Sequence, residues 1–337
     1  MDVEKQQHFD EIPFQRKVFG MDDMTLRDDS PCPIEYVETG AHTANTHAGQ
    51  MKLMLADEMS IMQGLLHIRS KSNTELAALG RENGRAKVAV VVAGAAPGNH
   101  FWDLSRTFGS VDFHLYDPAP RGWYPRLTDR DGPRNVYLYK QYFTEQTAQE
   151  WTAEKRDERY KHVIFLSDLR SGNGKVAAEV AGDMTLQQQL TRTIDACYSV
   201  LKFRPPYHDD TTTDAPALVY FDGTIYLQGY PPRNSTETRL HVTDTKSIKS
   251  YDIKVYQNQL FYHNQVTRNK TKVLFGPGDL RYDDAHSRFV KKFLLHYLGG
   301  ISERDEDNQR QLKFGHDRIR ALAVLLQDFK CLVNERP

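Results

Sequence analysis

Residues 90–104, VVVAGAAPGNHFWDL, decide the fold. An apolar run leads into Gly94 and Gly98, and a helical pattern follows the second glycine. A strand buried on both faces, a glycine turn and a helix, in that order, are typical of a doubly wound α/β sheet. Glycine lets the backbone approach a ligand closely, and the N-terminus of the next helix faces that ligand. The stretch therefore predicts a cofactor loop at the carboxyl end of a buried strand.

The spacing of the glycines indicates the kind of cofactor. The dinucleotide pattern G-x-G-x-x-G would require glycines where Ala96 and Asn99 stand, so an adenosyl amino acid is favoured and a nicotinamide enzyme is the weaker alternative. Asp117 ends the next predicted strand, roughly 20 residues on, where an acidic side chain accepts hydrogen bonds from both ribose hydroxyls. The alternative for Asp117 is a turn or N-cap residue before Pro118.

Outward from this loop, strands and helices alternate and predict one α/β sheet. Near-continuous apolar runs predict parallel strands, and closely spaced runs near the C-terminal part predict antiparallel strands that finish the sheet. The parallel strands are expected at 88–92, 113–116, 136–139 and 162–167, and the antiparallel strands at 218–221, 224–228 and 238–242. Helices are expected at 50–68, 100–108, 145–157, 183–200, 289–298 and 319–332.

The length of 337 residues suits one principal domain. We expect an N-terminal arm at 1–45, the main domain at 46–300, and a C-terminal helical segment at 301–337 that packs on the same domain. With 44 Lys+Arg against 45 Asp+Glu, contact with nucleic acid has to come from a local basic patch. Cys32, Cys197 and Cys331 are far apart and odd in number, which argues against a disulfide framework or a zinc site.

The sequence also bears on the cellular compartment. It shows no secretory start, and no apolar run reaches the roughly 18 residues that cross a bilayer. We therefore expect an intracellular, non-secreted protein of the nucleus or cytoplasm, or of a viral factory if the source is viral, with no membrane partner.

Four charged residues stand beside apolar segments. Asp168 follows the apolar run VIFL, and Lys202 and Glu237 stand where strands are expected to begin. Lys52 shares a helix face with Leu55 and Met59, where a lysine ordinarily extends its charge to solvent. For each residue taken singly, the alternative is ordinary exposure at the end of an element.

Taken together, the segments around these residues resemble a known family. Lys52, Asp168, Lys202 and Glu237 occur in the order of the K-D-K-E tetrad of RNA 2′-O-methyltransferases. The sequence resembles the poxvirus-type cap-specific mRNA (nucleoside-2′-O-)-methyltransferase and poly(A) polymerase stimulatory subunit family. The resemblance covers residues 36–270 and rests on six segments in order: GQMKLML, AGAAPGNH, VIFLSDLRS, SVLKFRPPY, STETRL and VTRNK.

The resemblance implies a Rossmann-like methyltransferase that uses S-adenosyl-L-methionine. It implies in-line transfer of the methyl group to a ribose 2′-oxygen, without a metal. Lys202 would orient the hydroxyl and receive or steer its proton, Asp168 and Glu237 would hold Lys202, and Lys52 would complete the network. The implied cofactor-binding residues follow the ends of the predicted strands: Gly94, Ala96, Pro97, Gly98, His100, Asp117, Phe143, Asp168 and Leu169.

The resemblance also implies a pocket for the cationic methylguanine of a 5′ cap. Tyr36 and Tyr207 would sandwich the ring, and Asp209 and Asp252 would accept its N–H groups. The alternative is that the tyrosines are core or interface residues, because the chain has 17 of them. The implied partners are 5′-capped mRNA and other mRNA-processing proteins.

The chain departs from the family pattern at two cofactor positions. Val92 stands where the family has an aromatic residue, and Ala119 where it has an arginine. The basic C-terminal tail of the family is missing, so a poly(A) polymerase partnership is not assumed. Two alternatives stay open: a 2′-O-methyltransferase of rRNA or tRNA of the heat-shock methyltransferase type, and a catalytically inactive cap-binding subunit.

Overall fold

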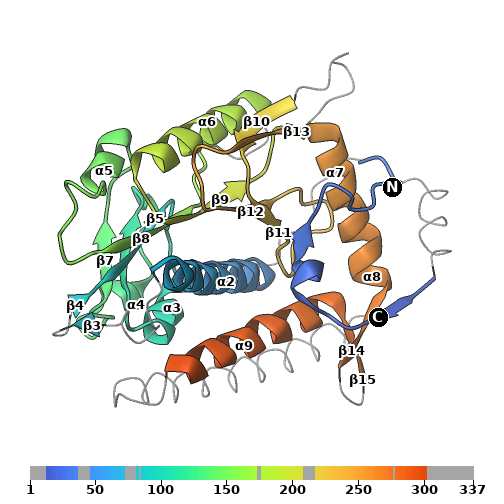
Figure 1. Cartoon of the computed structure of the whole chain (residues 1–337), viewed down its shortest axis with the longest axis horizontal. Coiled ribbons are helices and arrows are strands. Elements are labelled where there is room, and N and C mark those ends of the chain that lie inside the picture. The colour runs from blue at the N-terminus through green and yellow to red at the C-terminus, as the bar shows by residue number, and fades with distance from the viewer. Residues whose placement is uncertain are drawn as a thin grey trace.

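The computed structural model describes residues 13–36, 46–72, 81–82, 85–172, 176–207, 217–275 and 278–301. Its centre is an eight-stranded sheet with helices on both faces (Figure 1). In sheet order the strands are β2 (Thr25–Leu26), β11 (Thr224–Tyr226), β12 (Thr238–Val242), β9 (Tyr198–Phe203), β8 (His162–Ser167), β5 (Val88–Ala93), β6 (Asp112–Tyr116) and β7 (Val136–Tyr139). The predicted α/β class, with a mostly parallel central sheet, is confirmed.

The parallel and antiparallel parts of the sheet meet at β9. Strands β9, β8, β5, β6 and β7 pair in parallel, and β12 then pairs antiparallel with β9. From β5 the chain builds outward first through β6 and β7 and later through β8 and β9, so β5 and β8 flank a topological switch point. Open α/β sheets bind their ligands at such a point.

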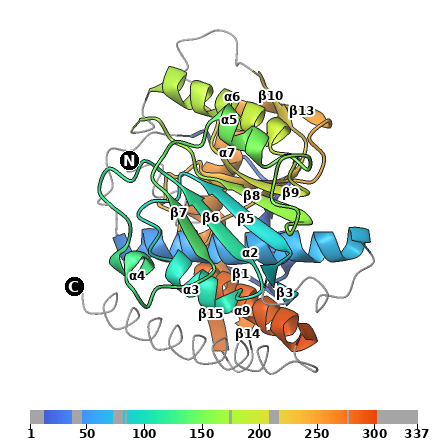
Figure 2. The same cartoon turned by 90° about the vertical axis from the view of Figure 1, so that its left-hand side faces the viewer.

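Strand β5 shows why both faces of the sheet are covered. Its side chains alternate: Val88, Val90 and Val92 belong to one apolar cluster, and Ala89 and Val91 belong to the other. The first cluster includes residues of α2 (Thr46–Ser72), α3 (Phe101–Thr107) and α9 (Tyr282–Ile301). The second includes residues of α5 (Glu145–Glu150), α6 (Ala177–Thr193) and α7 (Ile253–Tyr262). Figure 2 shows the two helical layers on opposite sides of the strands.

The remaining elements are short. They are η1 (Met21–Met24), the hairpin β3 (Arg81–Glu82) and β4 (Arg85–Ala86), α4 (Pro125–Thr128), the π-helix η3 (His263–Thr267), and α8 (Arg268–Lys270). A small three-stranded sheet has the order β1 (Gln15–Lys17), β14 (Thr271–Phe275) and β15 (Gly278–Arg281). Among the described residues no helix is both long and apolar enough to cross a membrane.

Three predictions about the elements are wrong. The helix expected at 183–200 ends at Thr193, because the chain turns at Asp195, whose φ is 55°, and β9 then begins. Lys202 therefore lies within a strand rather than at its start. The strand expected at 218–221 is β10 (Ala217–Phe221), which pairs with β13 (Ile248–Asp252) outside the central sheet, since β12 occupies the place beside β9.

The third concerns the helix expected at 145–157, which is α5 and ends at Glu150. The helix expected at 319–332 and Cys331 lie outside the described residues, as do residues 1–12 and 37–45 of the N-terminal arm and residues 302–337. The hairpin β14–β15 and the run from α7 to α8 were not expected from the sequence.

Candidate functional site

Four neighbouring elements bring the predicted tetrad together. Asp168 follows β8, and Lys202 lies near the end of β9, which is parallel to β8. Because β12 runs antiparallel to β9, its start lies beside the end of β9, and Glu237 directly precedes that start. Lys52 reaches the same point from α2. The antiparallel direction of β12 therefore places Glu237 at the edge of the sheet where the parallel strands have their carboxyl ends.

The four side chains form one chain of ion pairs. The Lys202 Nζ lies 2.9 Å from Asp168 Oδ1 and 3.3 Å from Glu237 Oε2. The Lys52 Nζ donates to Glu237 Oε1 across 2.7 Å. Lys52, Lys202 and Glu237 are 12–14% exposed and Asp168 is 30% exposed, so Asp168 forms the open side of the group.

Arg239 joins the tetrad, although it was not predicted from the sequence. Its guanidinium, 4% exposed, donates to Asp168 Oδ1 across 2.9 Å and lies 3.9 Å from Glu237 Oε1. The signal was available, since Glu237 and Arg239 are two residues apart at the edge of a strand and therefore share a face. Arg170 adds a further positive charge 3.6 Å from Glu237 Oε2.

These contacts keep both carboxylates ionised. Burial favours a neutral carboxyl, but the charges of Lys202 and Arg239 hold the pKa of Asp168 below its usual value. The pKa of Glu237 lies well below its usual value because Lys202, Lys52 and Arg239 together outweigh its burial. Conversely, although burial opposes its charge, Arg239 has a raised pKa owing to Asp168 and Glu237.

The glycine loop after β5 lies against Asp168. Gly94 and Gly98 have φ values of 81° and 75°, which side chains rarely adopt. A Cβ on Gly94 would lie 2.8 Å from the carbonyl oxygen of Asp168, so no larger residue fits there without a shift of the backbone. Asp117 accepts N–H groups from Ala96 at 3.2 Å and from Ala119 at 2.6 Å, and so fastens the loop to the end of β6.

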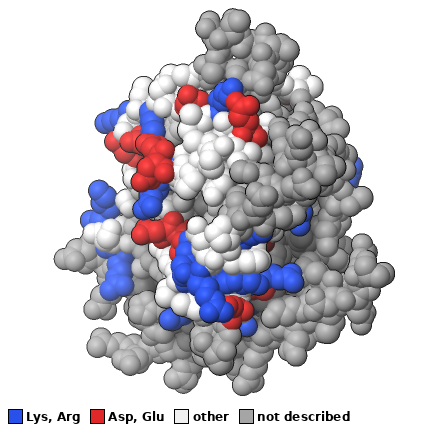
Figure 3. All heavy atoms as spheres, turned by 90° about the vertical axis from the view of Figure 1, so that its right-hand side faces the viewer, with Lys and Arg blue, Asp and Glu red and all other residues white. Residues whose placement is uncertain are grey.

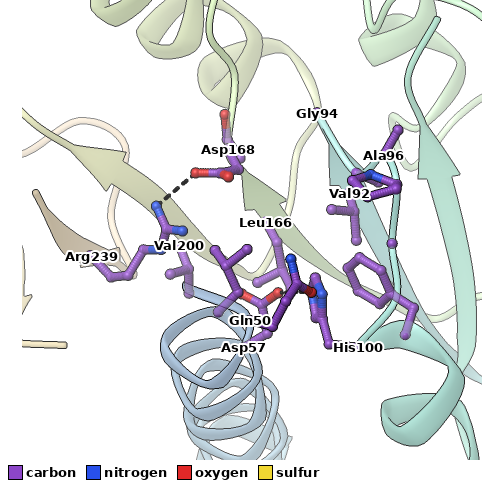
Figure 4. A pocket seen from close by; sticks show the side chains of 16 residues that line it. Gln50, Asp57, Val92, Gly94, Ala96, His100, Leu166, Asp168, Val200 and Arg239 are labelled. Carbon is purple, nitrogen blue, oxygen red and sulfur yellow. Dashed lines mark hydrogen bonds and ion pairs between the residues drawn. The ribbon is translucent and has the colours of Figure 1, made fainter. Parts of the chain in front are cut away.

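A hollow of about 500 Å³, partly open to solvent, lies between this loop and α2 (Figure 4). Its lining includes the predicted residues Gly94, Ala96, Pro97, Gly98, His100 and Asp168. Three buried polar atoms of the lining have no hydrogen-bond partner among the described residues: Gln50 Oε1, His100 Nδ1 and Ser167 Oγ. These unpaired polar atoms, together with the side-chain-free backbone at Gly94, fit a ligand with an amino-acid end, as S-adenosyl-L-methionine has.

His100 and Asp57 form a hydrogen-bonded pair in the lining of this hollow. His100 Nε2 lies 2.8 Å from Asp57 Oδ2, and both side chains reach the hollow. Asp57, Gln50 and Leu53 lie on one face of α2 at helical spacing, so an amphipathic reading of that helix could have found them. Among the described residues no group of three or more His, Cys, Asp or Glu side chains is placed to hold a metal ion.

Three predicted cofactor residues lie outside the lining of this hollow: Asp117, Phe143 and Leu169. Phe143 is 4% exposed and packs edge-on against Tyr116, with ring centroids 5.1 Å apart, and against Phe165. Leu169 packs on the second apolar cluster and lines a smaller hollow that also contains Lys202. Their role toward a cofactor stays a prediction.

The predicted cap residues are only partly within the described chain. The rings of Tyr36 and Tyr207 stack on each other, with centroids 5.4 Å apart and planes 20° apart. Asp252 is exposed and caps α7 by accepting the N–H of Val255 at 2.9 Å. Asp209 lies outside the described residues. The structure therefore brings the two tyrosines together, and Asp252 stands at the start of the helix whose Asn258 binds the backbone N–H of Tyr36.

The tyrosine pair is closed. A flat ring that stacks between two others needs about 3.5 Å on each side, so its neighbours must stand about 7 Å apart. At 5.4 Å the rings of Tyr36 and Tyr207 leave no such gap. Arg204 lies over the ring of Tyr207, 4.9 Å from its centroid, which shows that this ring already interacts with a cation.

Comparison with known proteins decides the family. The family model described as "Poly A polymerase regulatory subunit" matches residues 32–324. The chain belongs to this family. It is 26% identical over 264 residues to a protein of myxoma virus (strain Lausanne) named cap-specific mRNA (nucleoside-2′-O-)-methyltransferase, covering 73% of this chain and 69% of that protein. The fowlpox virus (strain NVSL) protein of the same name is 24% identical over 217 residues, covering 61% of this chain and 68% of its own.

The two departures from the family pattern lie near the cofactor loop. Val92 is 3% exposed and lines the hollow, so an apolar side chain occupies the place of the family's aromatic ring. Ala119 is 1% exposed, has a φ of 47° and donates to Asp117. The polar side chains that line the hollow near these positions include Gln50 and Asp57 from α2 and His100 from the start of α3.

Proposed function

We propose that this protein uses S-adenosyl-L-methionine to methylate the 2′-oxygen of a ribose near the 5′ cap of mRNA. The observation that carries the proposal is the convergence of Lys52, Asp168, Lys202 and Glu237 in one ion-pair chain beside a glycine loop. The names of the myxoma and fowlpox virus relatives support the same reaction.

Lys202 has the position of the residue that orients the attacking hydroxyl. A lysine ammonium has three protons, and the two carboxylates at 2.9 and 3.3 Å account for two of them. The third can point to the 2′-oxygen on the side of Asp168 that is open to solvent, and the proton that the hydroxyl gives up on methyl transfer passes to water on that side. Because Asp168 and Glu237 are fixed in turn by Arg239 and Lys52, the direction of this proton is set before the substrate arrives.

The residues of the hollow fit the methyl donor, which supplies an electrophilic methyl carbon on its sulfonium. Asp117, at the end of β6, has carboxylate oxygens that can accept from ribose hydroxyls in addition to the two backbone N–H groups. Gln50 Oε1 is an acceptor for the ammonium of the amino-acid end, and Asp57 fixes the ring of His100 beside it.

The stacked tyrosines are proposed to bind the methylated guanine of the cap. Its ring carries a positive charge, which aromatic faces attract, as Tyr207 already attracts Arg204. Binding would require Tyr36 and Tyr207 to separate from 5.4 Å. Asp252 and Asp209 are the proposed acceptors for the ring N–H groups.

Transfer of labelled methyl groups to capped and uncapped RNA of one sequence tests the proposal. We expect incorporation into capped RNA and at least tenfold less into uncapped RNA. Equal incorporation would replace the cap reading with the rRNA or tRNA alternative. No incorporation into either RNA, by protein that binds the methyl donor, would favour the inactive cap-binding subunit.

A second candidate role is regulation of a poly(A) polymerase, and the family match is the observation in its favour. Its test is co-purification with the poly(A) polymerase of the same source, followed by measurement of tail length with and without this protein. Unchanged tail length and no co-purification would remove this role.

A further inference from the structure

The three-stranded sheet β1–β14–β15 has one buried and one exposed face. On β14, Thr271 and Val273 are 3% and 0% exposed and point into the molecule. Because side chains alternate along a strand, the neighbouring positions point outward. The outward set on the described part of this sheet is Phe14, Arg16, Val18, Lys270, Lys272, Leu274, Asp279 and Arg281. We call this set the outer face.

Basic residues form a row across the outer face. The register places Arg16 opposite Lys272, and Lys272 opposite Arg281. Like charges directly opposite each other on adjacent strands are destabilising. Asp279 is the acidic member of the outer face and lies 2.9 Å from the guanidinium of Arg16. Four basic side chains and one acidic side chain leave a local positive charge on a chain whose net charge is −1.

Large apolar side chains stand among these cations. Phe14 is 59% exposed, Val18 75% and Leu274 47%. The Nζ atoms of Lys270 and Lys272 lie over the ring of Phe14, 5.1 and 5.3 Å from its centroid. Phe14 is thus a largely exposed aromatic ring bordered by two lysines.

We propose that the outer face binds single-stranded RNA, with phosphates along the row Arg16–Lys272–Arg281 and a base against Phe14. Proteins that bind single strands without sequence preference combine a positive surface with aromatic rings on which bases stack. A polyanion would also relieve the repulsion between the opposed cations. In Figure 3, which faces the side that carries α7 and β14, Lys and Arg atoms gather in the lower half.

The outer face lies within reach of a strand held at its cap, and this step rests on the proposed function. Residues 253–270 run from Asp252 through α7, η3 and α8 directly into β14 (Figure 1). At 1.5 Å per residue this rod is about 27 Å long. RNA whose capped end lies near Asp252 could therefore extend along the rod to Phe14 and Lys272, as a second contact apart from the tetrad.

The test is the salt dependence of binding to an uncapped single-stranded RNA of about 20 nucleotides. The variant Lys272→Gln/Arg281→Gln removes two cations of the row. The control Arg130→Gln/Lys155→Gln removes two exposed cations from other parts of the chain. For single strands, log K falls with log salt with a slope of about −0.7 per phosphate contact, so losing two contacts should make the slope shallower by about 1.4. Binding near 0.1 M salt should weaken by tenfold or more. The control pair should match the wild type.

A single substitution tests the aromatic part. Phe14→Ala should weaken RNA binding severalfold, and Phe14→Tyr should restore it because the ring face is retained. An unchanged slope in Lys272→Gln/Arg281→Gln, or an equal change in the control pair, overturns the proposal. If that variant keeps RNA affinity but loses affinity for polyglutamate, the face binds an acidic protein instead and the proposal is wrong.

The proposed function is tested separately in the same variants. Methyl transfer to a capped RNA of only about two nucleotides, too short to reach the outer face, should be unchanged in Lys272→Gln/Arg281→Gln. If wild-type protein binds long RNA but transfers no methyl group to capped RNA, the proposed function is contradicted and the proposal for the outer face still stands.

Discussion

The tetrad and the tyrosine pair are built in opposite ways. In the tetrad, Lys202 and Lys52 are held by carboxylates at 2.7–3.3 Å, with Arg239 closing the group from a buried position. In the tyrosine pair, Tyr36 and Tyr207 contact each other and occupy the space that a ligand would need. The difference suggests a division of labour: a preorganised centre that aims an atom, and a recognition site that opens only for a ring that attracts both faces.

Replacing the central lysine should have the largest effect. We expect Lys202→Ala to lower the rate of methyl transfer by about 10²–10⁴-fold, because it removes the group that orients the hydroxyl. Affinity for the methyl donor and for capped RNA, measured by calorimetry, should stay within a few-fold. Lys140→Ala, at an exposed lysine, is the control. Near-normal turnover by purified Lys202→Ala would remove this mechanism.

The glycine loop offers a matched pair of substitutions. Gly94 and Gly122 have φ values of 81° and 82°, but a Cβ would meet the Asp168 carbonyl only at Gly94, and nothing within 4 Å at Gly122. Both alanine variants should carry about 1–2 kcal/mol of backbone strain, and Gly94→Ala a further 1–3 kcal/mol from overpacking. Urea denaturation measures the stability, and donor affinity should fall only in Gly94→Ala. Equal effects would mean that the close approach to Asp168 is unimportant.

The tyrosine pair should recognise the positive charge of the 7-methylguanine ring. Desolvated cation–π contacts reach about 2 kcal/mol, so Tyr207→Ala should weaken a 7-methylguanosine cap analogue much more than a guanosine analogue. Tyr207→Phe should be mild, since the ring face remains. Asp252→Asn should weaken binding by losing a charge-assisted hydrogen bond. Fluorescence quenching provides the affinities, and wild-type protein that binds both analogues equally would refute the pocket.

The last effect concerns the stability of the fold around the tetrad rather than activity. Burial and the charge of Arg239 lower the pKa of His241 to about 3, so this ring stays neutral in the folded protein. Below the unfolded value of about 6.5 the unfolded chain gains a proton that the folded chain does not, and stability falls by about 1.4 kcal/mol per pH unit for this group.

The variant His241→Asn should therefore lose stability less steeply than the wild type between pH 6 and pH 4. The free energy of unfolding at each pH, from urea titration, gives the two slopes. Identical slopes would mean that His241 is protonated in the folded protein, which would place another positive charge beside Arg239.

The sequence predicted much of the fold for local reasons, because apolar runs marked β5, β6, β7 and β8. The family resemblance, rather than local spacing, singled out Asp168, Lys202 and Glu237. The sequence could not place β10, because pairing with β13 depends on which strand lies beside β9, a long-range matter. The end of α6 was missed because Asp195 adopts a positive φ, which aspartate does only occasionally.

Within the site, the sequence indicated candidate residues but not which side chains contact one another. Arg239 shares a strand face with Glu237, but its pairing with Asp168 depends on the antiparallel position of β12 beside β9. The closed state of Tyr36 and Tyr207 could not be foreseen either, since nothing in their spacing fixes the distance between their rings.

The location of the transferred methyl group tests the central claim most directly. Capped RNA is incubated with the protein and S-adenosyl-L-methionine, digested to nucleosides and cap fragments, and analysed by mass spectrometry. The geometry around Lys202 predicts a methyl group on the 2′-oxygen of a ribose near the cap, formed at least about 10²-fold more slowly by Lys202→Ala. A methyl group found instead on a base, or on N7 of the cap guanine, would contradict the account.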